Sequence, residues 1–174
     1  MILAFQGVEP KIDSSVFVTP SADVIGDVCI GANSSVWFNC VIRGDVNGVS
    51  IGENSNIQDL SMIHVTHYEK EDKSDGFATI IGNNVTIGHH AMLHGCVIED
   101  ACLIGMSSTI LDGAIIGQES IVGAGSLVTK NKVFPPRSLI MGNPAKLIRT
   151  LNDDEVASLY ESAANYVSFK AMYR

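Results

Sequence analysis

"IEDACLIGMSSTILDGAIIGQESIVGAGSLV", residues 98–128, carries an aliphatic residue at every sixth position. The repeated residues are Ile98, Ile104, Ile110, Ile116, Val122 and Val128. An α-helix repeats near 3.6 residues and a half-buried strand repeats at 2, so neither explains a period of six. A mostly small residue follows four positions after each aliphatic one, at Cys102, Ser108, Ala114, Ser120 and Ser126. This pattern predicts a parallel β-helix, in which each hexapeptide makes one short strand and one turn.

The same period continues upstream with short interruptions. The aliphatic positions there are Val18, Val24, Ile30, Val36 and Ile42, then Ile51, Ile57 and Ile63, then Ile81, Ile87 and Leu93. Three hexapeptides close one triangular coil, so we expect a three-sided prism with these side chains stacked inside it. The small residues then occupy the inner corners, where larger side chains do not fit.

Two segments depart from the period. The polar segment "HYEKEDKSDGF", residues 67–77, is expected to loop out of the coil. The segment "VFPPRSLIMGNPAK", residues 133–146, carries three prolines and is expected to end the coil after Val128. We therefore predict an all-β parallel β-helix domain over residues 1–150, with an extruded loop at 66–79.

A C-terminal α-helix is expected over residues 151–174, packed along the prism. Asn152 has the side chain of a helix N-cap, and Asp153, Asp154 and Glu155 would lie at the positive end of the helix. The apolar stripe predicted to face the prism consists of Val156, Leu159, Tyr160, Ala163 and Val167.

Composition limits the partners and the compartment. The chain of 174 residues has 11 basic and 19 acidic residues and a formal charge of −8, which argues against nucleic-acid binding. "MILAFQG" lacks a basic leader and a long apolar run, so neither a signal peptide nor a membrane partner is expected. The four cysteines, Cys29, Cys40, Cys96 and Cys102, form no CxxC pair, and we expect reduced, buried thiols in a cytoplasmic protein.

All five histidines lie between positions 64 and 94. Counting by coils puts Ile63 one coil after Ile42 and Leu93 one coil after Ile63, so the residues that follow them, Arg43, His64 and His94, share one column. Neighbouring coils are about 4.8 Å apart, the spacing of hydrogen-bonded strands. At that spacing two imidazoles can share one metal ion, with bonds of roughly 2.0–2.1 Å.

His89 lies on a different face of the prism, above Asp59. If the three histidines bind one metal, His89 must therefore come from a neighbouring subunit, and copies arranged around a threefold axis would satisfy this. Three imidazoles with an open fourth position are typical of catalytic zinc. For His67 and His90, an ordinary surface or partly buried role is the more economical interpretation.

Four blocks in this order resemble the γ-class carbonic anhydrases. These blocks are "VIRGDV" (41–46), "NIQDLSMIH" (56–64), "IGHHAMLHGC" (87–96) and "GNPAK" (142–146), and the resemblance covers nearly the whole chain. It implies a left-handed β-helix and a homotrimer. It also implies Zn²⁺ or Fe²⁺ bound by His64 and His94 of one subunit and His89 of the next.

The resemblance also suggests roles for residues around the metal. Arg43 and Asp45 would tie subunits together, with Arg43 positioning bicarbonate, and Gln58 would hydrogen-bond to metal-bound solvent. Asp59 would join the intersubunit ion pairs, and Tyr160 would hydrogen-bond near the site.

The chain departs from the family pattern in the loop that normally carries a proton-shuttling glutamate. The loop is shorter here, and His67 stands where that glutamate is expected. Imidazole exchanges protons near neutral pH, so His67 is a candidate relay. Glu69, Glu71 and Asp72 are further candidates, although a solvated loop is the more economical explanation of their charges.

Reversible hydration of CO2 to bicarbonate by a metal-bound hydroxide at the subunit interface is the leading functional hypothesis. One alternative is a hexapeptide-repeat acyltransferase, which would use one histidine as a general base and a basic groove for coenzyme A phosphates, or a thioesterase, which would use the metal-bound hydroxide. Another is a trimeric scaffold in which the metal only joins the subunits. Hydration assays, an acyl-CoA hydrolysis screen and removal of the metal distinguish the three.

Overall fold

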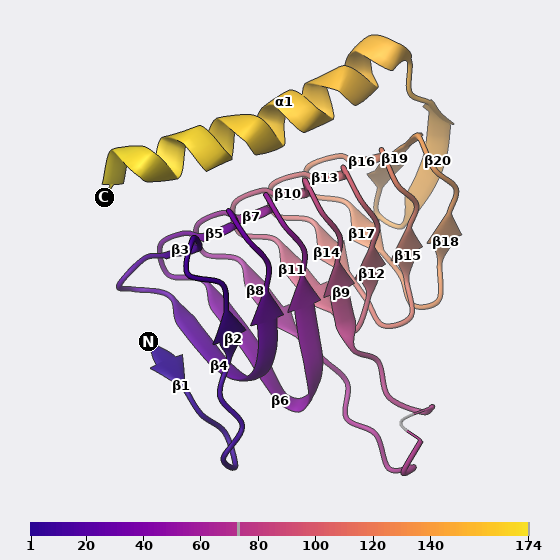
Figure 1. Ribbon diagram of the computed structural model, residues 1–174. Helices are drawn as coiled ribbons and strands as arrows, with labels where there is room; N and C mark the ends of the chain where they lie inside the picture. Colours follow the sequence, from indigo (N-terminus) through magenta and orange to yellow (C-terminus); the bar gives the residue numbers. More distant parts are fainter. Residues whose placement is uncertain (73, 174) are drawn as a thin grey trace.

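The structure, a computed structural model, describes residues 1–72 and 74–173. Within this part of the chain, short and mostly parallel strands stack into two sheets with one α-helix beside them (Figure 1). One sheet contains β1 (Ile2–Leu3), β2 (Lys11–Ile12), β4 (Asp23–Ile30), β6 (Val41–Ile51), β8 (Met62–His64), β9 (Thr79–Ile81), β11 (Met92–His94), β12 (Val97–Ile98), β14 (Thr109–Ile110), β15 (Ile115–Ile116), β17 (Leu127–Val128) and β18 (Val133–Phe134). The other contains β3 (Phe17–Val18), β5 (Ser35–Val36), β7 (Asn56–Ile57), β10 (Thr86–Ile87), β13 (Leu103–Ile104), β16 (Ile121–Val122), β19 (Ser138–Gly142) and β20 (Ala145–Thr150).

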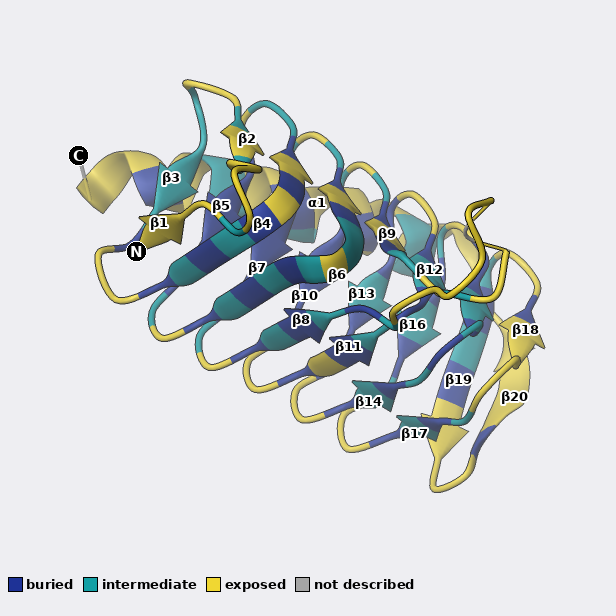
Figure 2. Cartoon of the chain, turned by 90° about the horizontal axis from the view of Figure 1, so that it is seen from below, coloured by how far each residue is buried: buried dark blue, intermediate teal, exposed yellow. Residues whose placement is uncertain are grey.

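The six-residue period is confirmed as the spacing of the stacked core. Ile57 pairs with Ile87, and Ile87 with Ile104, in parallel register on three successive coils. These aliphatic side chains are buried, and Figure 2 shows the buried positions recurring from strand to strand along the prism. The small residues four places later, such as Cys40 and Ser108, are buried as well. The chain is thus a parallel β-helix, as the repeat predicts.

Strand β6 bends around one corner of the prism and lies on two of its faces. Its first residues pair with β8, and its last residues pair with β9 on the next face. The bend lies near Gly44, where an added Cβ would be 2.3 Å from the backbone oxygen of Asp27. Only glycine fits this close approach of two backbones. The bend places Arg43 and Asp45 at the same corner as His64.

The expected end of the coil after Val128 is wrong. Strands β18 and β19 continue the parallel ladder by pairing with β15 and β16, and Phe134 and Ile140 continue the six-residue series. Pro135 and Pro136 lie between these strands, in a turn where no ladder N–H is needed. The coil ends instead where β20 turns back antiparallel to β19.

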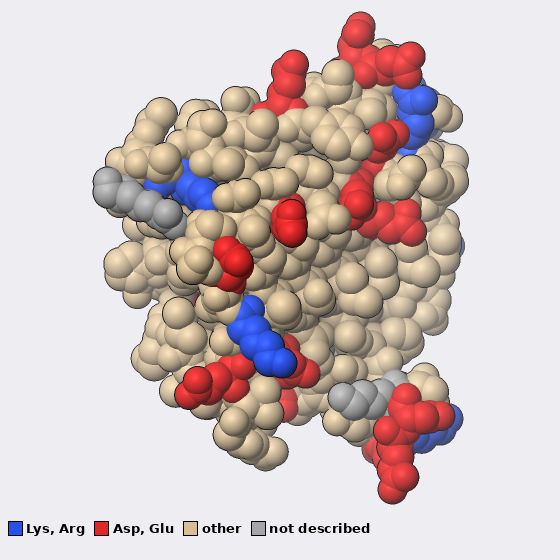
Figure 3. All heavy atoms as spheres, in the orientation of Figure 1, with Lys and Arg blue, Asp and Glu red and all other residues tan. Residues whose placement is uncertain are grey.

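The polar segment leaves the prism between β8 and β9, as expected. An antiparallel bridge between Thr66 and Phe77 closes its base, and the amide of Asn47 donates to the carbonyl of Thr66 at 3.1 Å. Figure 3 shows acidic and basic side chains together on this projecting loop. The expectation of buried cysteines is confirmed for Cys40, Cys96 and Cys102 but is wrong for Cys29, which is exposed on β4.

Helix α1 (Asp153–Phe169) and the short 3₁₀ helix η1 (Lys170–Tyr173) run back beside the prism (Figure 1). Asn152 is the N-cap and forms a reciprocal capping box with Glu155. The helix packs on β7 and β10 through Leu159 and Ala163. Tyr160 does not belong to the apolar stripe, because it is 44% exposed. No helix in the described ranges is both long and apolar enough to cross a membrane.

Candidate metal centre

His64 and His94 lie on adjacent coils, as counting by hexapeptides predicts. They end β8 and β11 and pair in parallel register. Nδ1 of His64 lies 3.2 Å from Nε2 of His94, and the two ring planes make an angle of 63°. Both rings are only partly exposed. The β-ladder therefore brings two imidazole nitrogens to one point without any contribution from a loop.

Each of these rings uses its other nitrogen to contact a carboxylate. Nε2 of His64 lies 3.0 Å from Oδ1 of Asp45, and Nδ1 of His94 lies 2.6 Å from Oδ1 of Asp112. An ionised carboxylate only accepts, so the proton of each neutral ring is on the nitrogen facing it. The two nitrogens that face each other are then both lone-pair donors. Two lone pairs at this separation repel each other unless a cation lies between them.

Each carboxylate is also bonded to a basic side chain. The second oxygen of Asp45 accepts from Arg43, and that of Asp112 accepts from Lys130 at 2.8 Å. Burial opposes ionisation of Asp112, but hydrogen bonds from Lys130, Thr66 and His94 outweigh it and lower the pKa of its carboxyl to about 2. The pKa of Asp45 is lowered as well, because hydrogen bonds from His64 and Arg43 outweigh the effect of burial. Both carboxylates are therefore charged at neutral pH.

His89 follows β10 on a different face, as predicted. Its Nδ1 lies 2.8 Å from Oδ2 of Asp59, which leaves Nε2 directed elsewhere. His89 is 46% exposed. Across residues 1–72 and 74–173, no three His, Cys, Asp or Glu side chains are arranged to hold a metal ion. His89 therefore does not complete the pair formed by His64 and His94 within its own chain.

Gln58 lies beside His89 in a groove of about 410 Å³ that is otherwise largely apolar. Its Nε2 donates to Oδ1 of Asn56 at 3.1 Å, and Nδ2 of Asn56 donates to the hydroxyl of Thr86 at 3.1 Å. That hydroxyl is in turn 3.1 Å from the hydroxyl of Ser162 on α1. This series of hydrogen bonds fixes the amide of Gln58. Its carbonyl oxygen is then the atom left to accept a hydrogen bond in the groove.

The donor set fits a tetrahedral divalent ion. Two ligands bonded at roughly 2.0–2.1 Å in tetrahedral geometry are about 3.3 Å apart, close to the 3.2 Å that separates Nδ1 of His64 from Nε2 of His94. All three candidate histidines have a carboxylate on the other ring nitrogen. This pairing is characteristic of metal-binding histidines, because it fixes the tautomer and increases the basicity of the ligand.

Three other residues singled out in the sequence lie away from this cluster. His67 is exposed on the projecting loop, near Asp75. His90 is exposed too, with Nδ1 3.3 Å from the hydroxyl of Ser107. The hydroxyl of Tyr160 donates to Glu119 at 3.1 Å within the chain. The proposed roles of His67 and Tyr160 in catalysis stay predictions.

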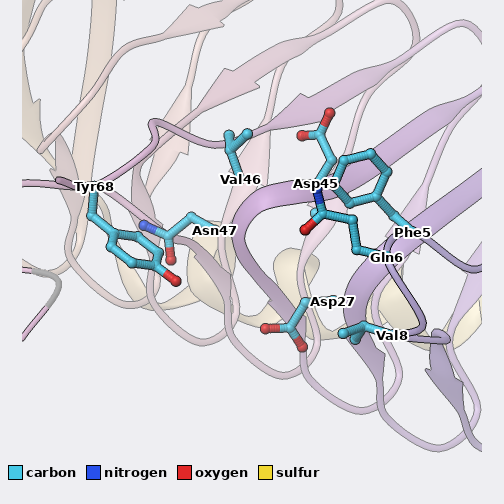
Figure 4. Close-up of a pocket in the computed structure, with 9 residues that line it drawn as sticks. Phe5, Gln6, Val8, Asp27, Asp45, Val46, Asn47 and Tyr68 are labelled. Atoms are coloured by element: carbon cyan, nitrogen blue, oxygen red, sulfur yellow. The ribbon is translucent and has the colours of Figure 1, made fainter. Parts of the chain in front are cut away.

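A second cavity, of about 290 Å³, lies next to the Arg43–Asp45 corner (Figure 4). The labelled side chains come from the N-terminal turn (Phe5, Gln6, Val8), from β4 and β6 (Asp27, Asp45, Val46, Asn47) and from the projecting loop (Tyr68). Asp45 is shared between this cavity and the contact with His64. Asp45 therefore lies between this cavity and the histidine pair.

Sequence reasoning missed Asp112, Lys130 and Thr66. Asp112 lies 18 residues after His94, which is three hexapeptides, and Lys130 follows Asp112 by the same interval. The hexapeptide count that aligned His64 with His94 does not find either residue, because Leu93 pairs with Ile110 and Ile110 with Val128, so the count continues to Leu111 and Thr129. Thr66 left no signal either, because it lies where the chain departs from the repeat.

Known proteins share both the repeat and the whole fold. Residues 95–130 match the family model described as bacterial transferase hexapeptide (six repeats). A crystal structure of a hexapeptide transferase family protein from Anaplasma phagocytophilum superposes with a TM-score of 0.92 and is 38% identical in sequence, covering 99% of this chain and 98% of that one.

The curated relatives are more specific. A probable carbonic anhydrase of Methanocaldococcus jannaschii is 53% identical over 90% of this chain and 93% of its own length. Gamma carbonic anhydrase 1 of Arabidopsis thaliana mitochondria is 50% identical over 90% of this chain. The chain spans only 56% of the length of that Arabidopsis protein. These relatives show that the chain belongs to the γ-class carbonic anhydrase family, and its β-helix and histidine pair agree with that assignment.

Proposed function

We propose that this protein catalyses the reversible hydration of CO2 to bicarbonate. The observation that carries the proposal is the 3.2 Å distance between Nδ1 of His64 and Nε2 of His94, each ring having a carboxylate on its other nitrogen, an arrangement that favours a cation between the two facing nitrogens. Membership of the γ-class family supports the same reaction. We infer that the cation is Zn²⁺, with Fe²⁺ as the alternative, and that His89 of a second subunit supplies the third imidazole of each site in a homotrimer.

The residues of the chain would divide the work. Such an ion, when bound, supplies a nucleophile at neutral pH by lowering the pKa of water to about 7. Asp45 and Asp112 keep the protons of His64 and His94 on the outward nitrogens. The carbonyl oxygen of Gln58, fixed by Asn56, would accept a hydrogen bond from the attacking water and so orient it toward CO2.

The bicarbonate product and the released proton would each interact with a further residue. The guanidinium of Arg43 lies at the corner beside His64 and would attract the bicarbonate anion. His67 is exposed on the nearby loop and would pass the proton to solvent. Asp59 would hold His89 for the intersubunit site, and Tyr160 would hydrogen-bond near the site. We also propose a cytoplasmic location, because the buried thiols of Cys40, Cys96 and Cys102 are typical of a reducing compartment.

The two alternatives require different features. An acyltransferase would use one histidine as a base, whereas nitrogens of two histidines, His64 and His94, meet at 3.2 Å here. A scaffold would need no residue such as Gln58 held in place beside the third histidine. The hydration reaction uses both features.

Mixed trimers test the shared site directly. We expect His89→Ala and His94→Ala chains each to be inactive alone and to recover about a quarter of the wild-type CO2 hydration when co-expressed in equal amounts. The reason is that random assortment leaves about one site in four with an intact histidine pair facing an intact His89.

The matched control is a mixture of His64→Ala and His94→Ala chains. Both residues belong to the same half of a site, so this mixture should recover nothing. Equal recovery in the two mixtures, or none in either while the wild-type protein is active, would overturn the shared site.

A further inference from the structure

Three polar contacts of the candidate centre converge on Asp112. Its Oδ1 accepts from Nδ1 of His94 at 2.6 Å and from the hydroxyl of Thr66 at 2.6 Å. Its Oδ2 accepts from Nζ of Lys130 at 2.8 Å. The side chain of Asp112 is only 9% exposed. A carboxylate with three donors from three separate parts of the chain is held in one position, and it holds His94 in turn.

Gly95 provides the space for this contact. It follows His94 with a φ of +57°, and an added Cβ would be 2.6 Å from Oδ1 of Asp112 and 2.7 Å from Cβ of Phe77. Any other residue would push the carboxylate away from the ring and would adopt this φ at a cost. The backbone next to His94 is therefore shaped to admit Asp112.

The arrangement parallels that of the other histidine of the pair. His64, Asp45 and Arg43 form the series imidazole, carboxylate and cation, and His94, Asp112 and Lys130 form it again one coil further along. A carboxylate on the outer nitrogen fixes which ring nitrogen has the proton. With the proton on Nδ1, His94 presents the lone pair of Nε2 toward His64.

We propose that Asp112, held by Thr66 and Lys130, is the positioning residue of His94: it fixes the tautomer that can bind a metal and so sets the metal affinity of the site. This inference rests on the proposed function, since it assumes that His94 is a ligand. Asp112 acts only through His94 and touches neither CO2 nor bicarbonate.

Asp112→Asn is the direct test. An amide can turn its NH2 toward Nδ1 of His94, which would move the ring proton to Nε2, the nitrogen meant for the metal. Titration with Zn²⁺ against a chromophoric chelator should show affinity about 10- to 100-fold weaker than wild type. In the metal-free protein, side-chain ¹⁵N NMR should show the proton of His94 on Nδ1 in the wild type and at least partly on Nε2 in the variant.

Two further variants keep the test decisive. Lys130 is 66% exposed, so Lys130→Met should fold even if Asp112→Asn does not, and it should weaken Zn²⁺ binding about threefold. Asp100→Asn removes a corner carboxylate that bonds to Asn83 outside the candidate centre, and it should bind Zn²⁺ like the wild type. Wild-type affinity and an unchanged tautomer in Asp112→Asn, or wild-type affinity in Lys130→Met where the former does not fold, would overturn the inference.

Failure of the proposed function would look different. A wild-type protein that takes up no Zn²⁺ or Fe²⁺, or that takes up metal without hydrating CO2, would contradict the carbonic anhydrase assignment. The NMR result on metal-free His94 would stand in either case, because it does not depend on activity.

Discussion

The two halves of the candidate site differ in how completely one chain builds them. His64 and His94 sit on paired strands, and each has its own carboxylate with a basic residue behind it. His89 contacts a carboxylate too, that of Asp59, but these two side chains are more exposed. Within residues 1–72 and 74–173, neither of them makes another ion pair. The first half is preorganised by the coil. The second half is left for another copy to complete.

The largest expected effects come from removing a histidine from each half. His94→Ala and His89→Ala should both lower CO2 hydration at least about a hundredfold, which corresponds to about 2.7 kcal/mol in the activation barrier. They should differ in metal content: His89→Ala keeps the preorganised pair on one chain, whereas His94→Ala leaves only His64 of one subunit and His89 of the next. Metal analysis after dialysis should therefore find more Zn²⁺ per subunit in His89→Ala. More Zn²⁺ in His94→Ala than in His89→Ala would mean that the His64–His94 pair is not the stronger half of the site.

Gly95→Ala tests how tightly the first half is packed. Its Cβ would clash with Asp112 and Phe77 at a positive φ, so we expect a loss of about 1–3 kcal/mol in the free energy of unfolding, together with weaker Zn²⁺ binding. Gly125→Ala is the control, because Gly125 has a φ of +68° but nothing within 4 Å of an added Cβ. It should cost only the backbone strain and leave metal binding unchanged. Equal metal affinity in the two variants would argue against close packing around Asp112.

The smallest expected effect concerns a contact far from both halves. Hydrogen bonds from Arg149 and from the backbone of Asn152 lower the pKa of Glu155 from 4.5 to about 2. A lowered pKa in the folded state means that this contribution to stability is complete above about pH 4.5 and is lost as the pH falls toward 2. Glu155→Gln should therefore melt below the wild type at pH 7, with the gap closing by about pH 2.

Circular dichroism melts across this pH range measure the effect. Glu161→Gln, on an exposed position of the same helix, is the control and should follow the wild type at every pH. A gap for Glu155→Gln that persists at pH 2 would contradict the assigned contact.

The core and the histidine pair could be predicted from the sequence because both depend on the repeat alone. A period of six placed Ile57 over Ile87 and His64 over His94 without knowledge of any contact. The end of the coil could not be predicted from the prolines, because Pro135 and Pro136 fall in a turn that tolerates them. Asp112 was missed because its importance lies in the reach of its side chain to a neighbouring coil. Periodicity does not report such a contact.

The base of the projecting loop determines how far the loop can vary in sequence and length. Because the bridge between Thr66 and Phe77 closes the base of the loop, the length of the loop beyond it does not affect how the coils on either side align. Loops of other lengths and charges can replace this one while the β-helix keeps its alignment. The proposed proton relay on the loop can therefore change independently of His64 and His94.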